Sequence, residues 1–126
     1  MIGVKTHTLI ATVRIGRTPR ALAFTPYGKF AYVIAGDAIS NLSVNDVKNH
    51  RVIATVQIFA GGFPNDIAFT PNGTLAYVVN DSVPGLVSAI DVKTHSVTTA
   101  IQISGGETPI DIEFTPDGKG KFAYVV

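Results

Sequence analysis

The stretch FTPYGKFAYV, residues 24–33, recurs twice further along the chain. It returns as FTPNGTLAYV at 69–78 and as FTPDGKGKFAYV at 114–125, where two extra residues follow the turn. The three copies begin at residues 24, 69 and 114, an even spacing of 45 residues in a chain of 126. Internal repeats of about this length are typical of solenoids, propellers and helical arrays.

The content of one repeat decides between these architectures. In the second repeat, apolar runs rich in β-branched and aromatic residues alternate with turn residues such as Pro71 and Gly73. No run shows a sustained helical period, so short strands joined by tight turns are expected. Four such strands predict an antiparallel meander, and meanders arranged radially form an all-β fold, the β-propeller. The predicted strands are 65–70, 74–79, 86–92 and 96–103.

The side-chain pattern of these strands favours sheets that are covered on both faces. Ile67 and Phe69 alternate with Ala68 and Thr70, so one face is bulky, the other is small, and neither is charged. Stacked propeller blades need this combination, because the large residues of one sheet meet the small residues of the next. Apolar residues make up 46% of the chain, which agrees with such stacking.

The repeats divide the chain into blades of four strands. Two whole blades are expected at about 17–58 and 62–103, and a composite blade from 107–126 together with 1–15. The whole chain, 1–126, is then one partial propeller of three blades, whereas propellers typically have four to eight. We expect a homodimer that closes a six-bladed ring, and a fragment of a longer propeller is the alternative.

The composite blade brings together the two ends of the repeat pattern. Residues 8–15 are expected to form its outer strand and to pair with 120–126 through a short strand begun by MIGV. The sequence leaves open whether this blade closes within one chain or by exchange between two chains.

Composition excludes several classes of function. The net charge is +1 and no basic run occurs, so binding to nucleic acid through a phosphate-neutralising patch is not expected. No apolar run approaches the roughly 20 residues of a membrane-spanning helix. The chain has no cysteine, which removes disulfides, thiolate metal sites and cysteine nucleophiles.

The three histidines do not indicate a metal site. His7, His50 and His95 follow Val-Lys-Thr or Val-Lys-Asn at the same position of each repeat, in the turn between the third and the outer strand. In a propeller these turns belong to different blades, too far apart to share an ion at about 2 Å. We therefore interpret them as turn residues, and the sequence predicts no metal site and no cofactor.

Four charged residues break the repeat where the inner strands begin, near the expected mouth of the central channel. They are Arg20, Asp66, Asp111 and Glu113. Gathered there, they could bind a cation or a small polar ligand. The alternative is that they are solvated by channel water or cap loop amides.

The second repeat, PNDIAFTPNGTLAYVVND…VSAIDVKTHSVTTAIQI, resembles the YVTN-type β-propeller repeat of archaeal surface-layer proteins and their bacterial relatives. The resemblance extends over essentially the whole chain, and the third repeat departs from it by inserting Gly120 and Lys121 after the turn. It implies a β-propeller and, for a longer parent protein, a place at the cell surface. The chain itself carries no recognisable signal peptide.

This family contains binding proteins, structural surface proteins and a few enzymes. The resemblance therefore favours a non-catalytic module that binds a protein or a small polar ligand, or that builds a surface structure, without catalytic residues. The alternative is a hydrolase of sugar lactones, because bacterial propellers similar to phosphogluconolactonase carry comparable turns. Such a reaction needs a general base and an oxyanion stabiliser, for which Glu113 and Arg20 are the candidate pair.

Overall fold

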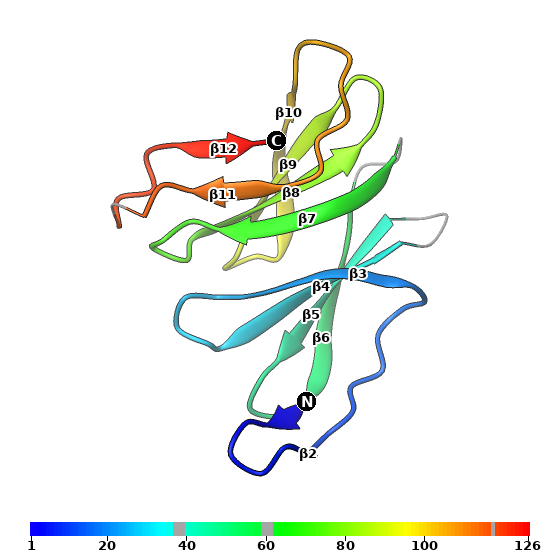
Figure 1. Ribbon diagram of the computed structural model, residues 1–126, viewed down its shortest axis with the longest axis vertical. Helices are drawn as coiled ribbons and strands as arrows, with labels where there is room; N and C mark the ends of the chain where they lie inside the picture. Colours follow the sequence, from blue (N-terminus) through cyan, green and yellow to red (C-terminus); the bar gives the residue numbers. More distant parts are fainter. Residues whose placement is uncertain (37–39, 59–61, 117) are drawn as a thin grey trace.

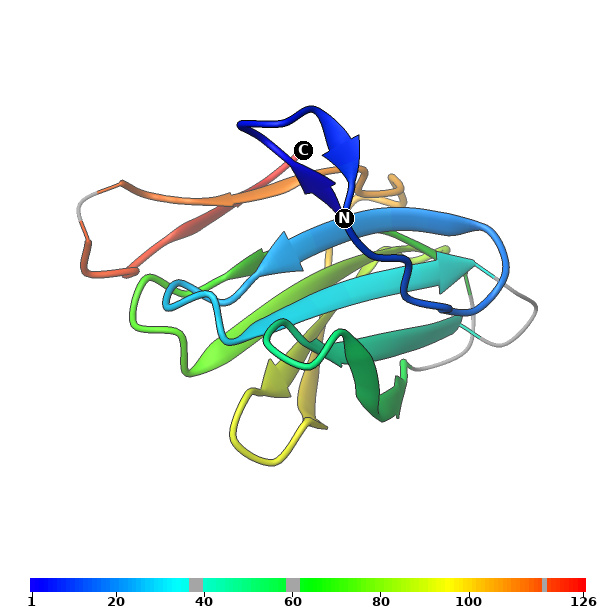
Figure 2. The ribbon, with the colours of Figure 1, turned by 90° about the horizontal axis from the view of Figure 1, so that it is seen from below.

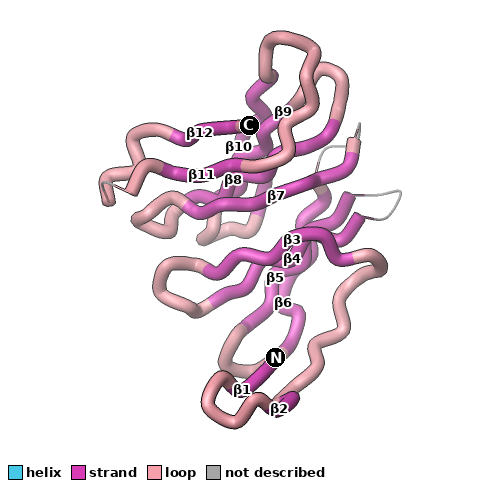
Figure 3. The backbone as a smooth tube through the Cα atoms, in the orientation of Figure 1, coloured by secondary structure: helices cyan, strands magenta, loops and turns pink. Residues whose placement is uncertain are grey.

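The computed structural model describes residues 1–126 except 37–39, 59–61 and 117. Its twelve strands form four antiparallel sheets, and no helix occurs among the described residues (Figures 1 and 3). It follows that the described part contains no helix able to cross a membrane. The all-β prediction is confirmed.

Two of the sheets are four-stranded meanders in which each strand pairs with the next one along the chain. Their orders are β3-β4-β5-β6 and β7-β8-β9-β10. These are the two units that the repeat predicts as whole blades, and the stacked arrangement in Figure 1 is compatible with a β-propeller. The strands are β3 Pro19–Phe24, β4 Phe30–Gly36, β5 Ser40–Asp46, β6 Arg51–Gln57, β7 Phe63–Phe69, β8 Leu75–Asp81, β9 Leu86–Asp91 and β10 Ser96–Gln102.

A two-stranded hairpin lies at each end of this stack. One consists of β1 (Ile2–Gly3) and β2 (Thr8–Leu9), and the other of β11 (Ile112–Phe114) and β12 (Ala123–Val125). In Figure 1 the N-terminal hairpin lies below the β3–β6 sheet and the C-terminal hairpin above the β7–β10 sheet. The pairing expected between 8–15 and 120–126 is therefore not formed within this chain, because the two hairpins lie at opposite ends of the stack.

The turns repeat with the sequence. Gly28, Gly73 and Gly118 have φ angles of 67°, 69° and 70°, in the left-handed region that glycine enters without steric cost. In the second repeat, the Gly73 N–H donates to the Thr70 carbonyl at 2.7 Å, which closes the turn between β7 and β8. These angles agree with the tight turns that the sequence predicts between the strands.

Each innermost strand begins with a β-bulge at the residue after its proline. Arg20 in β3 and Asn65 in β7 have no partner of their own in the pairing register. In the third repeat, the N–H groups of Ile110 and Asp111 both donate to the Val126 carbonyl, so that two residues oppose one. The bulge changes the direction of the side chain that follows it, which is Asp66 in the second repeat and Asp111 in the third.

The core lies between the sheets. Tyr32 and Ile34 of the β3–β6 sheet are fully buried against Ile67 and Val78 of the β7–β10 sheet. A smaller cluster joins the β7–β10 sheet to the C-terminal hairpin through Val79, Val87 and Ile112. Large side chains from both sheets meet in this core, with alanines of both sheets between them, so the expected packing of a bulky face on a small one holds only in part.

Candidate functional site

The first strands of successive sheets run side by side along one edge of the stack. β7 contacts β3 on one side and β11 on the other, and Figures 1 and 2 show the three strands next to one another. All four residues singled out in the sequence lie on these strands or directly before them. The site is therefore a band across three inner strands.

Asp66 and Asp111 meet in this band. Their carboxyl groups come close together because both accept from the same backbone N–H, that of Ile112. The Ile112 N–H donates to Asp66 Oδ2 at 3.1 Å and to Asp111 Oδ1 at 2.8 Å. Asn65 adds a link between the two repeats, because its side-chain amide donates to the Pro109 carbonyl at 3.0 Å.

The environment of the pair raises the pKa of Asp66 above its ordinary value. Partial burial is the largest cause, followed by the hydrogen bond to Asp111, and the negative charge of Asp111 adds to it. The backbone N–H groups of Ile67 and Ile112 act in the opposite direction. The charge of Asp111 disfavours the ionised form of Asp66, and a cation bound beside the pair would offset this repulsion.

Stability should respond to pH through the raised pKa of Asp66. Because the folded chain binds a proton at Asp66 more tightly than the unfolded chain, folding should become more favourable as pH falls from neutrality through that pKa. The gain should be complete near the ordinary Asp pKa of about 3.9. We expect Asp66→Asn to lose this gain, because an amide keeps the acceptor for Ile112 but does not titrate.

The measurement is the melting temperature of the wild type and the variant at several pH values from 4 to 8. The difference between them should change with pH, whereas Glu113→Gln, which alters an exposed carboxyl on the neighbouring strand, should run parallel to the wild type. Parallel curves for all three proteins would contradict the raised pKa of Asp66.

Arg20 and Glu113 do not join the carboxyl pair. The Arg20 guanidinium lies 4.9 Å from the centroid of the Phe63 ring, in a cation–π contact between β3 and β7. Glu113 is exposed on β11, where it pairs with Tyr124 of β12. The structure therefore brings two of the four residues together and leaves the other two apart. Within the described ranges, no group of three acids, histidines or cysteines could hold a metal ion.

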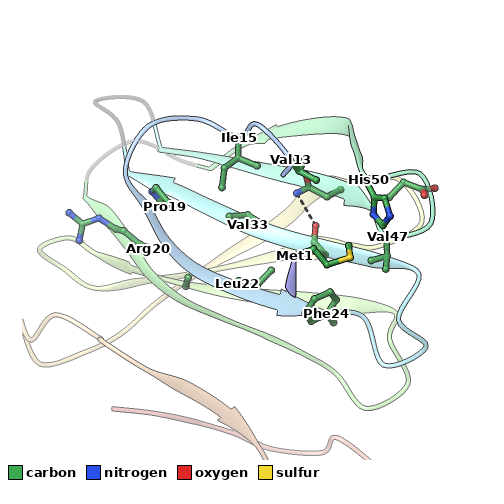
Figure 4. A pocket seen from close by; sticks show the side chains of 14 residues that line it. Met1, Val13, Ile15, Pro19, Arg20, Leu22, Phe24, Val33, Val47 and His50 are labelled. Atoms are coloured by element: carbon green, nitrogen blue, oxygen red, sulfur yellow. Dashed lines mark hydrogen bonds between the residues drawn. The ribbon is translucent and has the colours of Figure 1, made fainter. Parts of the chain in front are cut away.

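A second feature, not singled out in the sequence, is an apolar pocket of about 440 Å³ between the N-terminal segment and the open face of the β3–β6 sheet (Figure 4). Val13 and Ile15 form one wall, and Leu22 and Phe24 of β3 form another. His50 lies at one end, whereas Arg20 points away from the apolar side chains. A sequence signal for this pocket exists in β3, where Leu22 and Phe24 form a bulky apolar face. Such a face needs a neighbouring sheet to cover it.

The histidines are turn residues, as expected. His7, His50 and His95 have φ angles of 53°, 54° and 51° in equivalent turns. His95 has a further role that sequence reasoning missed, because its Nδ1 lies 2.6 Å from the Tyr32 hydroxyl of the other four-stranded sheet. Burial is the main reason why the pKa of His95 is lowered. This contact ties the two sheets together.

Comparison with known proteins supports the architecture. No family model matches the sequence, and no curated protein matches it. Among solved structures, the chain is similar to Kuenenia stuttgartiensis hydrazine synthase, with a TM-score of 0.85 and 27% sequence identity. The match covers 94% of this chain and 33% of that one, so this chain spans about a third of the length of the structure it resembles.

Proposed function

We propose that this chain is a non-catalytic β-propeller module that binds a cationic ligand at the carboxyl pair of Asp66 and Asp111. Its two four-stranded sheets act as blades, its two hairpins are the halves of a third blade, and a second copy completes a ring of six. The observation that carries the binding function is the convergence of two carboxyl groups from neighbouring repeats on one backbone N–H, that of Ile112. The resemblance to YVTN-type repeats supports the blade assignment.

A cation is the ligand that suits this pair. The negative charge of Asp111 disfavours ionisation of Asp66, and a metal ion or an ammonium group bound between the two carboxyl groups would offset that repulsion. Calcium prefers carboxylate and carbonyl oxygens, and sites with few protein ligands bind it weakly. The Asn65 side chain holds the two repeats together beside the pair, so the carboxyl groups are already positioned before a ligand arrives.

The geometry gives no support to the alternative of lactone hydrolysis. A general base and an oxyanion stabiliser must both reach the same substrate. Arg20 belongs to β3 and Glu113 to β11, and β7 lies between them (Figure 1). The Arg20 guanidinium is directed at Phe63 instead.

The test is a titration of thermal stability at pH 7.5. Calcium chloride and 1,3-diaminopropane are the two probes, and sodium chloride at equal ionic strength is the control for screening. At ten times the dissociation constant, binding should add about 1.4 kcal/mol to the free energy of unfolding. That corresponds to a rise of a few degrees in melting temperature.

Asp66→Asn should abolish the rise, and Glu113→Gln should keep it because Glu113 lies outside the pair. A response to calcium alone would identify a metal site, and a response to the diamine alone would identify an amine site. If neither probe shifts the wild-type melting temperature at millimolar concentration, the cationic ligand must be abandoned.

A further inference from the structure

We propose that two copies of this chain dock the C-terminal hairpin of one copy on the open face of the β3–β6 sheet of the other, with Tyr124 packed against Phe24. The inference rests on the proposed function in two respects, the treatment of the sheets as propeller blades and the second copy that completes the ring. It names the partner of the apolar pocket as a second copy of this chain and identifies the residues that make the junction.

The contacts inside the chain supply the template. The Tyr32 ring meets Phe69 of the next sheet edge to face at 5.0 Å, and the Tyr77 ring meets Phe114 in the same way at 5.4 Å. These tyrosines and phenylalanines come from the same positions of successive repeats. Among the residues that the structure describes, two members of the series have no such partner, Tyr124 at one end and Phe24 at the other.

Their exposure shows that both faces are open. Tyr124 is 68% exposed and its neighbour Val126 is 75% exposed, on the outer side of the C-terminal hairpin. At the other end, Phe24 and Leu22 are each 56% exposed, although their counterparts in the second repeat, Phe69 and Ile67, pack in the core. One end of the stack therefore exposes the face that carries Tyr124. The other end exposes the face that carries Phe24, on which a tyrosine of this series would pack.

The polar groups of the pocket repeat the same pattern. Within the chain, the Tyr32 hydroxyl contacts His95 of the next sheet. At the open face the equivalent histidine is His50, which lines the pocket. Asn45 also lines it, and its buried Oδ1 has no hydrogen-bond partner in the described structure. An incoming Tyr124 hydroxyl would be placed beside both groups, as Tyr32 is placed beside His95.

The N-terminal hairpin already has the form of the missing outer half of a blade. Its pairs Gly3–Thr8 and Ile2–Leu9 correspond to Asp91–Ser96 and Ile90–Val97 of the β9–β10 hairpin. It lies against the open face of the β3–β6 sheet, whereas the C-terminal hairpin supplies the two inner strands of a sheet. In the docked pair, β12 of one copy should pair with β1 of the other and complete a four-stranded sheet.

The expected interface combines face packing with strand pairing. Two strands about 17 Å long and about 4.8 Å apart cover roughly 150 Å² on one face. A two-fold arrangement has two junctions and covers four such faces, roughly 600 Å² in total, which by itself lies below the range for specific complexes. The backbone pairing of β12 with β1 at each junction therefore has to supply the rest of the interface.

The first test is the mass of the 126-residue chain in solution, measured by light scattering. The wild type should be a dimer of 13.3 kDa chains. Phe24→Asp and Tyr124→Asp should each raise the dissociation constant at least about 100-fold, because central aromatic residues dominate such interfaces. Tyr27→Asp, which changes a tyrosine 85% exposed in the neighbouring turn, should leave the dimer intact.

The second test shows the orientation and does not depend on loss of binding. Because the chain has no cysteine, Phe24→Cys and Tyr124→Cys variants can be joined by a short bismaleimide. A mixture of the two should give cross-linked dimers, since one junction then carries both cysteines and the other is wild type. Each variant alone should stay uncross-linked.

A monomeric wild type, a trimer, or cross-linking by each variant alone would overturn the proposal. The outcome is separable from that of the proposed ligand. Phe24→Asp lies away from Asp66, so calcium or diamine binding can be measured on it whether or not dimers form. Failure of the ligand titration with a dimeric wild type would reject only the binding function.

Discussion

Replacing Tyr32 by alanine is expected to lower the free energy of unfolding by about 3–5 kcal/mol, the range found for large aromatic side chains deleted from cores. Tyr32 is fully buried between the two four-stranded sheets. Its ring contacts Phe69 at 5.0 Å, and its hydroxyl contacts His95 Nδ1 at 2.6 Å. Burial, assisted by the charge of Asp91, raises the pKa of Tyr32 to about 12, so the hydroxyl stays neutral and remains a donor.

Two further variants separate the ring from the hydroxyl. Tyr32→Phe keeps the ring and should cost about 1–2 kcal/mol, because it leaves the partly buried His95 nitrogen without its partner. Tyr27→Ala, at a tyrosine 85% exposed, should change the free energy of unfolding by less than about 0.5 kcal/mol. Urea denaturation measures all three. A cost below 1 kcal/mol for Tyr32→Ala would mean that the two sheets do not pack through this side chain.

The strands could be predicted from the sequence because local signals bound them. The strands predicted at 65–70 and 74–79 correspond to β7 (Phe63–Phe69) and β8 (Leu75–Asp81). Gly73 fixes the turn between them. Positive φ at that glycine and the alternation of side chains are properties of a few neighbouring residues. Elements defined in this way need no knowledge of the rest of the chain.

The candidate site could be predicted only in part, because it depends on contacts between repeats. Asp66 and Asp111 occupy the same position of successive repeats, after the bulge, and adjacent repeats bring equal positions together. Arg20 precedes that position by one residue, and the bulge directs its side chain toward Phe63. Glu113 lies two residues beyond Asp111 on an open face, so charge alone did not predict which residues meet.

The contact of His95 with Tyr32 shows the same limit. The turn conformation of His95 follows from its place in the repeat, and the φ angle agrees. Its hydrogen-bond partner lies 63 residues away in the sequence and is set by how one sheet stacks on the other. The repeat pattern then becomes informative again, because one observed contact predicts its counterparts at every other junction.

Gly62 marks a close approach that the repeat does not predict. Arg17 and Glu107 stand at the same position of the first and third repeats, so no shared turn rule demands a glycine there. In the structure, the chain entering β7 passes directly against the end of β8. A Cβ on Gly62 would overlap the carbonyl oxygen of Asp81 and come within 2.8 Å of the Ser82 nitrogen, both of which are backbone atoms.

Gly62→Ala is therefore expected to lower the free energy of unfolding by about 3 kcal/mol or more, since backbone must move to admit the methyl group. The pairing of Phe63 with Asp81 follows immediately, so the shift should loosen the start of β7 and disturb the nearby Asp66–Asp111 pair as well. Arg17→Ala is the matched control at the same repeat position, and its exposed side chain should make it nearly neutral. Urea denaturation of the two variants decides the matter, and equal stability would show that β7 does not begin against the end of β8.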